Sequence, residues 1–227
     1  MRAAVVAALV TAFLAGAGSA RAEPYHIVFS ADRDGDRDLY AASVNGDGAV
    51  AITRNAQDDV GALLSPDRRS IALKRGPNLV LLEPGARERV IARGLPQAWS
   101  PDGRQLAFVA APKYELRILD LVRGRTRQVT HWGHGAWFPS WSPNGRQIAF
   151  EDADGSAFIV DLATGRRTAI GLSDEFSPIW SPTGFDVAYA GERDNFLSAV
   201  TVISPHEKPF VIQGDWPDWS PGGRELA

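Results

Sequence analysis

The chain has 227 residues, no cysteine and a formal net charge of −3, with 44% hydrophobic and 22% charged residues. This composition is ordinary for a soluble globular protein of one domain or two very small ones. The nearly neutral charge argues against nucleic-acid binding. Without cysteine there can be no disulfide bond and no lipid-modified N-terminal cysteine, so packing alone must hold the fold together.

Residues 1–22 have the pattern of a secretory signal peptide. Arg2 supplies a positive start, Ala3–Gly16 is an apolar run, and Ala20 and Ala22 place small residues at the −3 and −1 positions. We therefore expect cleavage after Ala22 and a periplasmic or secreted protein. A membrane anchor is the alternative, but the apolar run is shorter than the ~20 residues that span a bilayer.

Residues 23–227 contain a repeat of nearly constant length. Ser-Pro pairs recur at spacings of 35, 42, 39 and 39 residues, at Ser65, Ser100, Ser142, Ser181 and Ser220. A period near 40 residues is typical of one four-stranded propeller blade. The residue before each serine is large and apolar: Leu64, Trp99, Trp141, Trp180 and Trp219. Because a buried indole removes ~150–250 Å² from water, we interpret these five residues as repeat core and not as a ligand platform.

Each repeat divides into four short strands, here named A to D in chain order. In four of the five repeats, strand A ends at the tryptophan and a Ser-Pro-x-Gly turn follows it; the first repeat has Leu64 and Ser-Pro-Asp-Arg. Strands B and C are short and apolar, as in 105–110 and 115–120, and strand D closes the unit. Helical periodicity is absent from the mature chain. The pattern predicts an all-β fold, a five-bladed β-propeller of four-stranded antiparallel blades.

The segment "WSPDGRQLAF" (99–108), together with "DRDGDRDLY" (32–40), resembles the WD40-like (PD40) propeller repeat of the TolB family. The resemblance covers Tyr25 to Ala227. TolB proteins carry an α/β domain before a six-bladed propeller, whereas here Glu23 and Pro24 alone separate the signal peptide from the first strand. The resemblance therefore implies a TolB-like propeller without that N-terminal domain, and a role in a Tol–Pal-type envelope system as one alternative.

The strand count suggests how the ring closes. The mature chain begins with a B strand and contains five B-C-D sets and five A strands. The numbers match if the last A strand, which ends at Ser220, joins the first set, as the family resemblance also implies. Such closure leaves no open sheet edge. The alternative is a truncated six-bladed propeller. In the closed ring, the tail "GRELA" (223–227) has no partner, and we expect it to be frayed.

The loops sort onto two faces because strand direction alternates. The D–A and B–C loops share one face, and they are rich in acidic residues at 31–38, 55–59, 151–155, 173–176 and 191–195. The opposite face is basic. One interpretation is ordinary turn chemistry. The other is a face whose field attracts a protein or peptide partner of basic character.

We place the candidate partner-binding residues on this acidic face. They are Asp58, Asp59, His131, Trp132, His134, Asp174 and Glu175. Two histidines three residues apart make a weak metal site. The aspartates that start at Asp32 do not fit a calcium-binding EF-hand loop, because Gly35 is at position four and Ser43 at position twelve. We therefore expect no metal and no cofactor.

Motifs for nucleophilic catalysis, such as Gly-x-Ser-x-Gly, are absent. The sequence favours a monomeric, non-catalytic scaffold that binds a protein or peptide. The alternative is a carbohydrate-binding or glycoside-hydrolase-like propeller that uses carboxylates of the central funnel. The candidates for that role are Asp58, Asp59, Asp174, Glu175 and Asp215.

Overall fold

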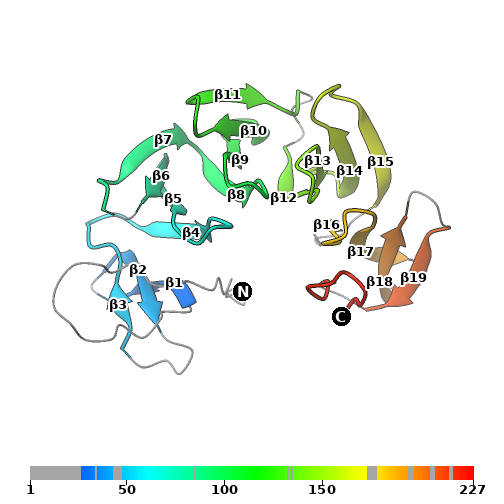
Figure 1. Cartoon of the computed structure of the whole chain (residues 1–227), viewed down its shortest axis with the longest axis horizontal. Helices are drawn as coiled ribbons and strands as arrows, with labels where there is room; N and C mark the ends of the chain where they lie inside the picture. Colours follow the sequence, from blue (N-terminus) through cyan, green and yellow to red (C-terminus); the bar gives the residue numbers. More distant parts are fainter. Residues whose placement is uncertain are drawn as a thin grey trace. The chain divides into compact units, whose positions relative to one another are not determined.

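The computed structural model describes residues 27–33, 35–42, 48–83, 85–131, 133, 135–172, 178–193, 197–204, 208–214 and 217–227. This part of the chain contains nineteen strands and no helix, which confirms the all-β prediction (Figure 1). Several predicted features lie outside the described residues, namely the signal peptide and Trp132, His134, Asp174, Glu175 and Asp215.

The strands form five antiparallel sheets in simple meander order. The first sheet contains β1 (Ile27–Asp32), β2 (Arg37–Ala42) and β3 (Val50–Ala51). The second contains β4 (Asp59–Leu64), β5 (Ile71–Arg75), β6 (Asn78–Leu82) and β7 (Arg89–Arg93). The third contains β8 (Leu95–Trp99), β9 (Gln105–Ala110), β10 (Glu115–Asp120) and β11 (Arg125–Gln128).

The last two sheets repeat the same order. The fourth contains β12 (Trp137–Trp141), β13 (Gln147–Glu151), β14 (Ser156–Asp161) and β15 (Arg167–Leu172). The fifth contains β16 (Ile179–Trp180), β17 (Val187–Arg193), β18 (Leu197–Ile203) and β19 (Phe210–Gln213). Each four-stranded sheet therefore matches one predicted A-B-C-D blade, and the first sheet supplies the B, C and D strands with which the mature chain was predicted to begin.

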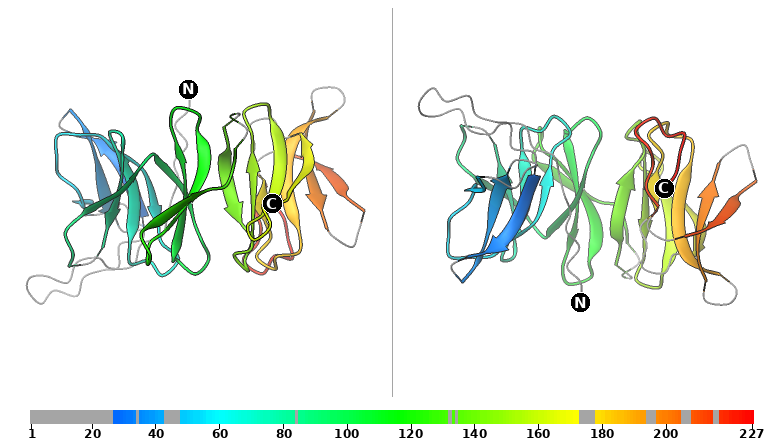
Figure 2. Two further views of the ribbon diagram at one scale, coloured as in Figure 1. Left: turned by 90° about the horizontal axis from the view of Figure 1, so that it is seen from above. Right: turned by 90° about the horizontal axis from the view of Figure 1, so that it is seen from below.

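The chain divides into two compact units at the junction of Trp99 and Ser100. Unit 1 contains β1 to β8, and unit 2 contains β9 to β19. Figure 2 shows the sheets from two further directions.

The Ser-Pro-x-Gly segments form A–B turns that are stabilised by hydrogen bonds of their own side chains. In one of them, the hydroxyl of Ser100 donates to Oδ1 of Asp102 at 2.6 Å and accepts from the amide of Gln105 at 2.9 Å. Gly103 has φ 67°, which glycine adopts at little cost. The same contacts recur around Ser142 and Asn144. The repeated sequence thus fixes the turn that leads from each tryptophan into the next strand.

The core lies between the sheets, on strands B and C. In unit 1 its buried members are Val28, Leu39, Ile71, Leu73, Val80 and Leu82, with Ile52, Ala62 and Leu64 packed at their margin. In the fifth sheet, Ala188, Ala190, Val200 and Val202 pack against Ile179, Trp219 and Leu226. Burial of these apolar side chains is the main stabilising contribution, at about 25 cal/mol per Å² removed from water.

The repeat tryptophans lie at the margin of this core. Trp141 is 8% exposed, whereas Trp99, Trp180 and Trp219 are half-buried. The indole of Trp99 donates to the carbonyl of Leu63 at 3.1 Å. That of Trp219 donates to the carbonyl of Ile179 at 3.3 Å. In these two repeats, the tryptophan therefore joins its own A strand to the A strand one repeat earlier.

The C-terminal tail is ordered, so the expectation that residues 223–227 are frayed was wrong. Trp219 pairs with Leu226 in an antiparallel bridge, and Asp218 and Ala227 exchange two backbone hydrogen bonds of 3.0 and 2.9 Å. The turn at Ser220 reverses the chain, and Leu226 then packs on the fifth sheet. In the described residues Trp219 thus begins a hairpin; its pairing with the first blade stays a prediction.

Among the described residues, there is no helix of the length and apolar character needed to cross a membrane.

Candidate functional site

In unit 1, the B–C turn and the D–A loop touch each other, in agreement with the predicted sorting of loops. The amide of Arg37 donates to Oδ1 of Asp58 at 2.9 Å. The hydroxyl of Ser30 donates to the carbonyl of Asp59 at 2.9 Å. Asp58 is exposed, but one of its oxygens holds the backbone of the neighbouring turn.

Asp59, a candidate partner-binding residue, is fully buried and forms an ion pair. Arg75 contacts its carboxylate with two nitrogens, Nε at 2.6 Å from Oδ1 and Nη2 at 2.9 Å from Oδ2. The amide of Asn55 adds a hydrogen bond of 2.9 Å to Oδ2. Arg75 also reaches Glu88 at 2.6 Å. The hydrogen bonds that Arg75 donates to Asp59 raise the pKa of Arg75, and the network anchors the D–A loop.

A second buried carboxylate clamps the start of strand C. Asp38 is 3% exposed and accepts a hydrogen bond of 3.1 Å from the hydroxyl of Thr53, which itself accepts from the amide of Leu39 at 2.9 Å. This arrangement ties the end of strand D to the start of strand C. It positions the residues that follow Thr53, among them Arg54 and Asn55.

The same clamp recurs in unit 2. The hydroxyl of Thr130 donates to Glu115 and accepts from the amide of Leu116 at 2.9 Å. Glu115 also accepts from the amide of Gly133 at 2.7 Å. The pattern was not predicted, although the sequence carries a signal for it: in both repeats a threonine follows the acidic residue after 15 positions.

His131 is exposed and lies inside this clamped loop. It belongs to unit 2, whereas Asp58 and Asp59 belong to unit 1. Trp132 and His134 lie outside the described residues, as do Asp174 and Glu175. Among the residues that are described, no group of three or more His, Asp or Glu side chains has the arrangement of a metal site.

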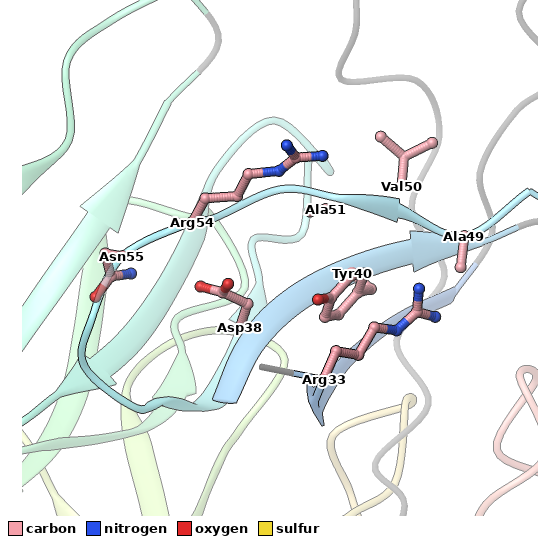
Figure 3. Close-up of a pocket in the computed structure, with 8 residues that line it drawn as sticks. All are labelled: Arg33, Asp38, Tyr40, Ala49, Val50, Ala51, Arg54 and Asn55. Atoms are coloured by element: carbon pink, nitrogen blue, oxygen red, sulfur yellow. The ribbon is translucent and has the colours of Figure 1, made fainter. Parts of the chain in front are cut away.

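A pocket of about 480 Å³ opens on the first sheet, beside the clamp formed by Asp38 (Figure 3). The residues that line it are Arg33, Asp38, Tyr40, Ala49, Val50, Ala51, Arg54 and Asn55. They come from the B–C turn, from β2, from β3 with its preceding residue, and from the D–A loop. The pocket therefore lies where the predicted partner-binding loops of unit 1 meet.

The pocket presents two arginines and an aromatic ring. The guanidinium of Arg33 lies 4.3 Å from the ring centre of Tyr40, which stacks on Phe29 at 5.8 Å. In Figure 3, Asp38 and Tyr40 lie between the side chains of Arg33 and Arg54. Arg33 and Arg54 are exposed and form no ion pair in the described part of the chain, whereas Asp38 is engaged with Thr53.

This arrangement favours an anionic ligand group. Guanidinium groups bind carboxylates with paired, charge-assisted hydrogen bonds. The volume lies within the usual range for ligand pockets. Sequence reasoning missed Arg33 and Arg54 because each stands in a polar loop, where arginine is common for solubility.

Comparison with known proteins identifies the fold. No family model matches the sequence, and no curated protein matches it. Solved structures do match. TolB from Acinetobacter baumannii is 18% identical over 84% of this chain and 53% of its own, with a TM-score of 0.61. An oligogalacturonate lyase from Vibrio parahaemolyticus is 16% identical over 88% of this chain and 66% of its own, with a TM-score of 0.71.

A third structure, described as a TolB from Agrobacterium tumefaciens, is 19% identical over 96% of this chain and 86% of its own, with a TM-score of 0.62. The five meander sheets and these likenesses define an all-β, TolB-like β-propeller of five blades. At these identities the likeness shows the fold alone, and one fold hosts many functions. The chain spans about half the length of the A. baumannii protein.

Proposed function

We propose that this protein is a non-catalytic binding module that takes a protein or peptide at the D–A/B–C loops of unit 1. The observation that carries the proposal is the pocket in which Arg33 and Arg54 flank Tyr40. Its ligand group is a carboxylate, on an acidic side chain or at a chain terminus.

The loops around the pocket are preorganised for binding. Thr53 is fixed by Asp38, Asn55 by Asp59, and Arg37 by Asp58. Loops that are already ordered lose less conformational entropy when a ligand binds, which raises the affinity. The buried ion pair of Asp59 and Arg75 serves the same purpose, because it holds the base of the D–A loop.

The pocket changes the kind of partner expected at this end of the molecule. A basic partner was expected from the acidic residues of the D–A and B–C loops, among them Asp58 and Asp59. In unit 1, these carboxylates accept hydrogen bonds from the protein itself. We therefore propose an acidic segment as the partner at this pocket, and keep a basic partner as the alternative for the loops of unit 2.

The test is a binding titration of the mature chain with a fluorescent, glutamate-rich decapeptide. Each arginine should contribute about 1.5–3 kcal/mol to a hydrogen-bonded carboxylate. We expect Arg33→Ala and Arg54→Ala each to weaken binding by about tenfold or more. The control is Arg87→Ala, an exposed arginine of the same unit outside the pocket. Equal losses in all three variants, or no binding by the wild type, would refute the proposal.

A second candidate function is binding of an acidic carbohydrate. The same two guanidinium groups suit the carboxylate of a uronic acid, and a structural neighbour is an oligogalacturonate lyase. Titration with a galacturonate trimer distinguishes this candidate from peptide binding. An unsaturated cleavage product in that experiment would show turnover and would contradict the non-catalytic proposal.

We also propose export to the periplasm or medium. A role as a TolB-like component of the cell envelope is an alternative for the exported protein. Export predicts that the protein secreted by a bacterial host begins at Glu23, which N-terminal sequencing measures. A mature protein that still begins at Met1 would contradict it.

A further inference from the structure

The last strand of the fifth sheet, β19, has an unusual outer edge. Three consecutive apolar residues are exposed on it, Phe210 by 48%, Val211 by 40% and Ile212 by 43%. β19 pairs with β18 along one side and ends the order of its sheet (Figure 1). An exposed apolar strand at a sheet edge is a template for pairing with another chain.

The outer strands of the three other four-stranded sheets carry positive charge. β7 contains Arg89 and Arg93, β11 contains Arg125 and Arg127, and β15 contains Arg167. Charged residues at sheet edges protect proteins from edge-to-edge pairing. β19 has the sequence Phe-Val-Ile-Gln and carries no charge itself, although Lys208 and Pro209 directly precede it.

The exposed side chains continue an apolar face of the fifth sheet. Phe210 pairs with Val202, and Ile212 pairs with Val200, so these four residues share one face of the sheet. Val200 and Val202 are buried under the hairpin of Trp219 and Leu226. Phe210 and Ile212 extend the same face toward the free edge.

We propose that β19 pairs, antiparallel, with β19 of a second copy of this chain, about a two-fold axis at Val211. Val211 then lies opposite its own copy, and each Phe210 lies opposite Ile212 of the other copy. Aromatic and β-branched residues form favourable cross-strand pairs. The apolar face of one fifth sheet continues into the other, which differs from the monomer expected from the sequence.

The charge pattern selects a second copy as the occupant. Two copies of β19 in this register oppose no like charges between Phe210 and Ile212. If two copies of β7 paired antiparallel about a two-fold axis at Ile91, Arg89 of each copy would lie opposite Arg93 of the other. Like charges directly opposite one another are destabilising. Self-pairing is therefore available to β19 and opposed in β7.

The test measures the oligomeric state of the mature chain by sedimentation velocity over a range of concentrations. We expect a monomer–dimer equilibrium for the wild type. Val211→Lys and Val211→Glu each place two like charges opposite one another, and each should raise the dimer dissociation constant by at least about tenfold. An equimolar mixture of the two variants should dimerise again, because lysine then faces glutamate.

The matched control is Val90→Lys on β7, at a valine that is 62% exposed. It should leave the dimer unchanged, and a thermal melt should show that all variants fold. A wild type that stays monomeric at every concentration would overturn the proposal. So would a mixture of the two Val211 variants that remains monomeric, or an equal loss of dimer in Val90→Lys.

Discussion

At the scale of single residues, the buried ion pair of Asp59 and Arg75 gives the sharpest prediction. Arg75→Met leaves the buried carboxylate of Asp59 without its main partner, which should cost about 3–5 kcal/mol of unfolding free energy. Urea denaturation measures the loss. The control is Arg89→Met, because Arg89 and Glu83 form a 2.8 Å pair whose members are both exposed. Such a pair contributes at most about 1 kcal/mol. Comparable losses of unfolding free energy in the two variants would contradict the structural role of the ion pair of Asp59 and Arg75.

The A–B turns predict a dependence of stability on pH. The hydroxyl of Ser100, followed by the amide of Arg104, lowers the pKa of Asp102 below its ordinary value of 3.8. A lowered folded-state pKa gives stability that is present above the unfolded pKa and is lost as the pH falls through the folded value. Asp102→Asn should therefore lose less stability than the wild type as the pH falls below about 4, through the folded-state pKa of Asp102.

Asn144 is the natural precedent for this variant. It occupies the same place in its own repeat and accepts from Ser142 and Arg146 at 2.9 Å each. We therefore expect Asp102→Asn to keep the turn at neutral pH, where its thermal midpoint should match that of the wild type. An acid transition identical in both proteins would refute the contribution of Asp102.

At the scale of elements, close contact between neighbouring sheets depends on a glycine. β15 has a bulge near Gly171, and the hydroxyl of Tyr189 from β17 donates to the carbonyl of Ile170 at 2.9 Å. A Cβ at Gly171 would lie 2.1 Å from that hydroxyl oxygen and 2.5 Å from Cζ of the ring. Gly171→Ala should therefore cost about 1–3 kcal/mol through overpacking.

Chemical denaturation of Gly171→Ala measures this cost, and Gly222→Ala provides the control. A Cβ at Gly222 meets no atom within 4 Å, so that variant should unfold like the wild type. If Gly171→Ala is as stable as Gly222→Ala, the packing of the two sheets does not depend on the close contact between Gly171 and Tyr189.

The elements themselves could be predicted from the sequence because their signals are local. Ser-Pro-x-Gly marks four of the five A–B turns, with Arg68 in the place of glycine in the first, and the apolar runs of strands B and C mark the core. The clamps of Asp38 with Thr53 and of Glu115 with Thr130 are harder to find, because the partners are 15 residues apart and meet only when strands C and D pair; their constant spacing is the signal that they leave in the sequence. The pocket was missed for a related reason: Arg33 and Arg54 meet only when the B–C turn and the D–A loop fold together.

At the scale of the whole molecule, the repeat predicted the number and order of the blades, and the five meander sheets confirm both. The role of the C-terminal segment was harder to predict, because the same tryptophan strand can pair with either of two neighbours. The sequence count assigned it to the first blade. In the described residues Trp219 pairs with Leu226 through one edge, and its pairing with the first blade stays a prediction. Strand pairing depends on the competition between partners, which a repeat count does not contain.

Removal of residues 221–227 tests whether the C-terminal hairpin contributes to stability. If these residues contribute nothing, the deletion should leave the unfolding free energy unchanged. The hairpin predicts a different result, because the deletion removes two backbone hydrogen bonds to Asp218 and the packing of Leu226 on the fifth sheet. Burial of a leucine contributes about 1.5–3 kcal/mol when it is complete, so we expect a loss of about 1–3 kcal/mol. Urea unfolding of the truncated chain measures it, with Arg224→Ala in the full chain as the control for an exposed tail residue. A truncated chain as stable as the wild type would contradict the contribution of the hairpin to stability.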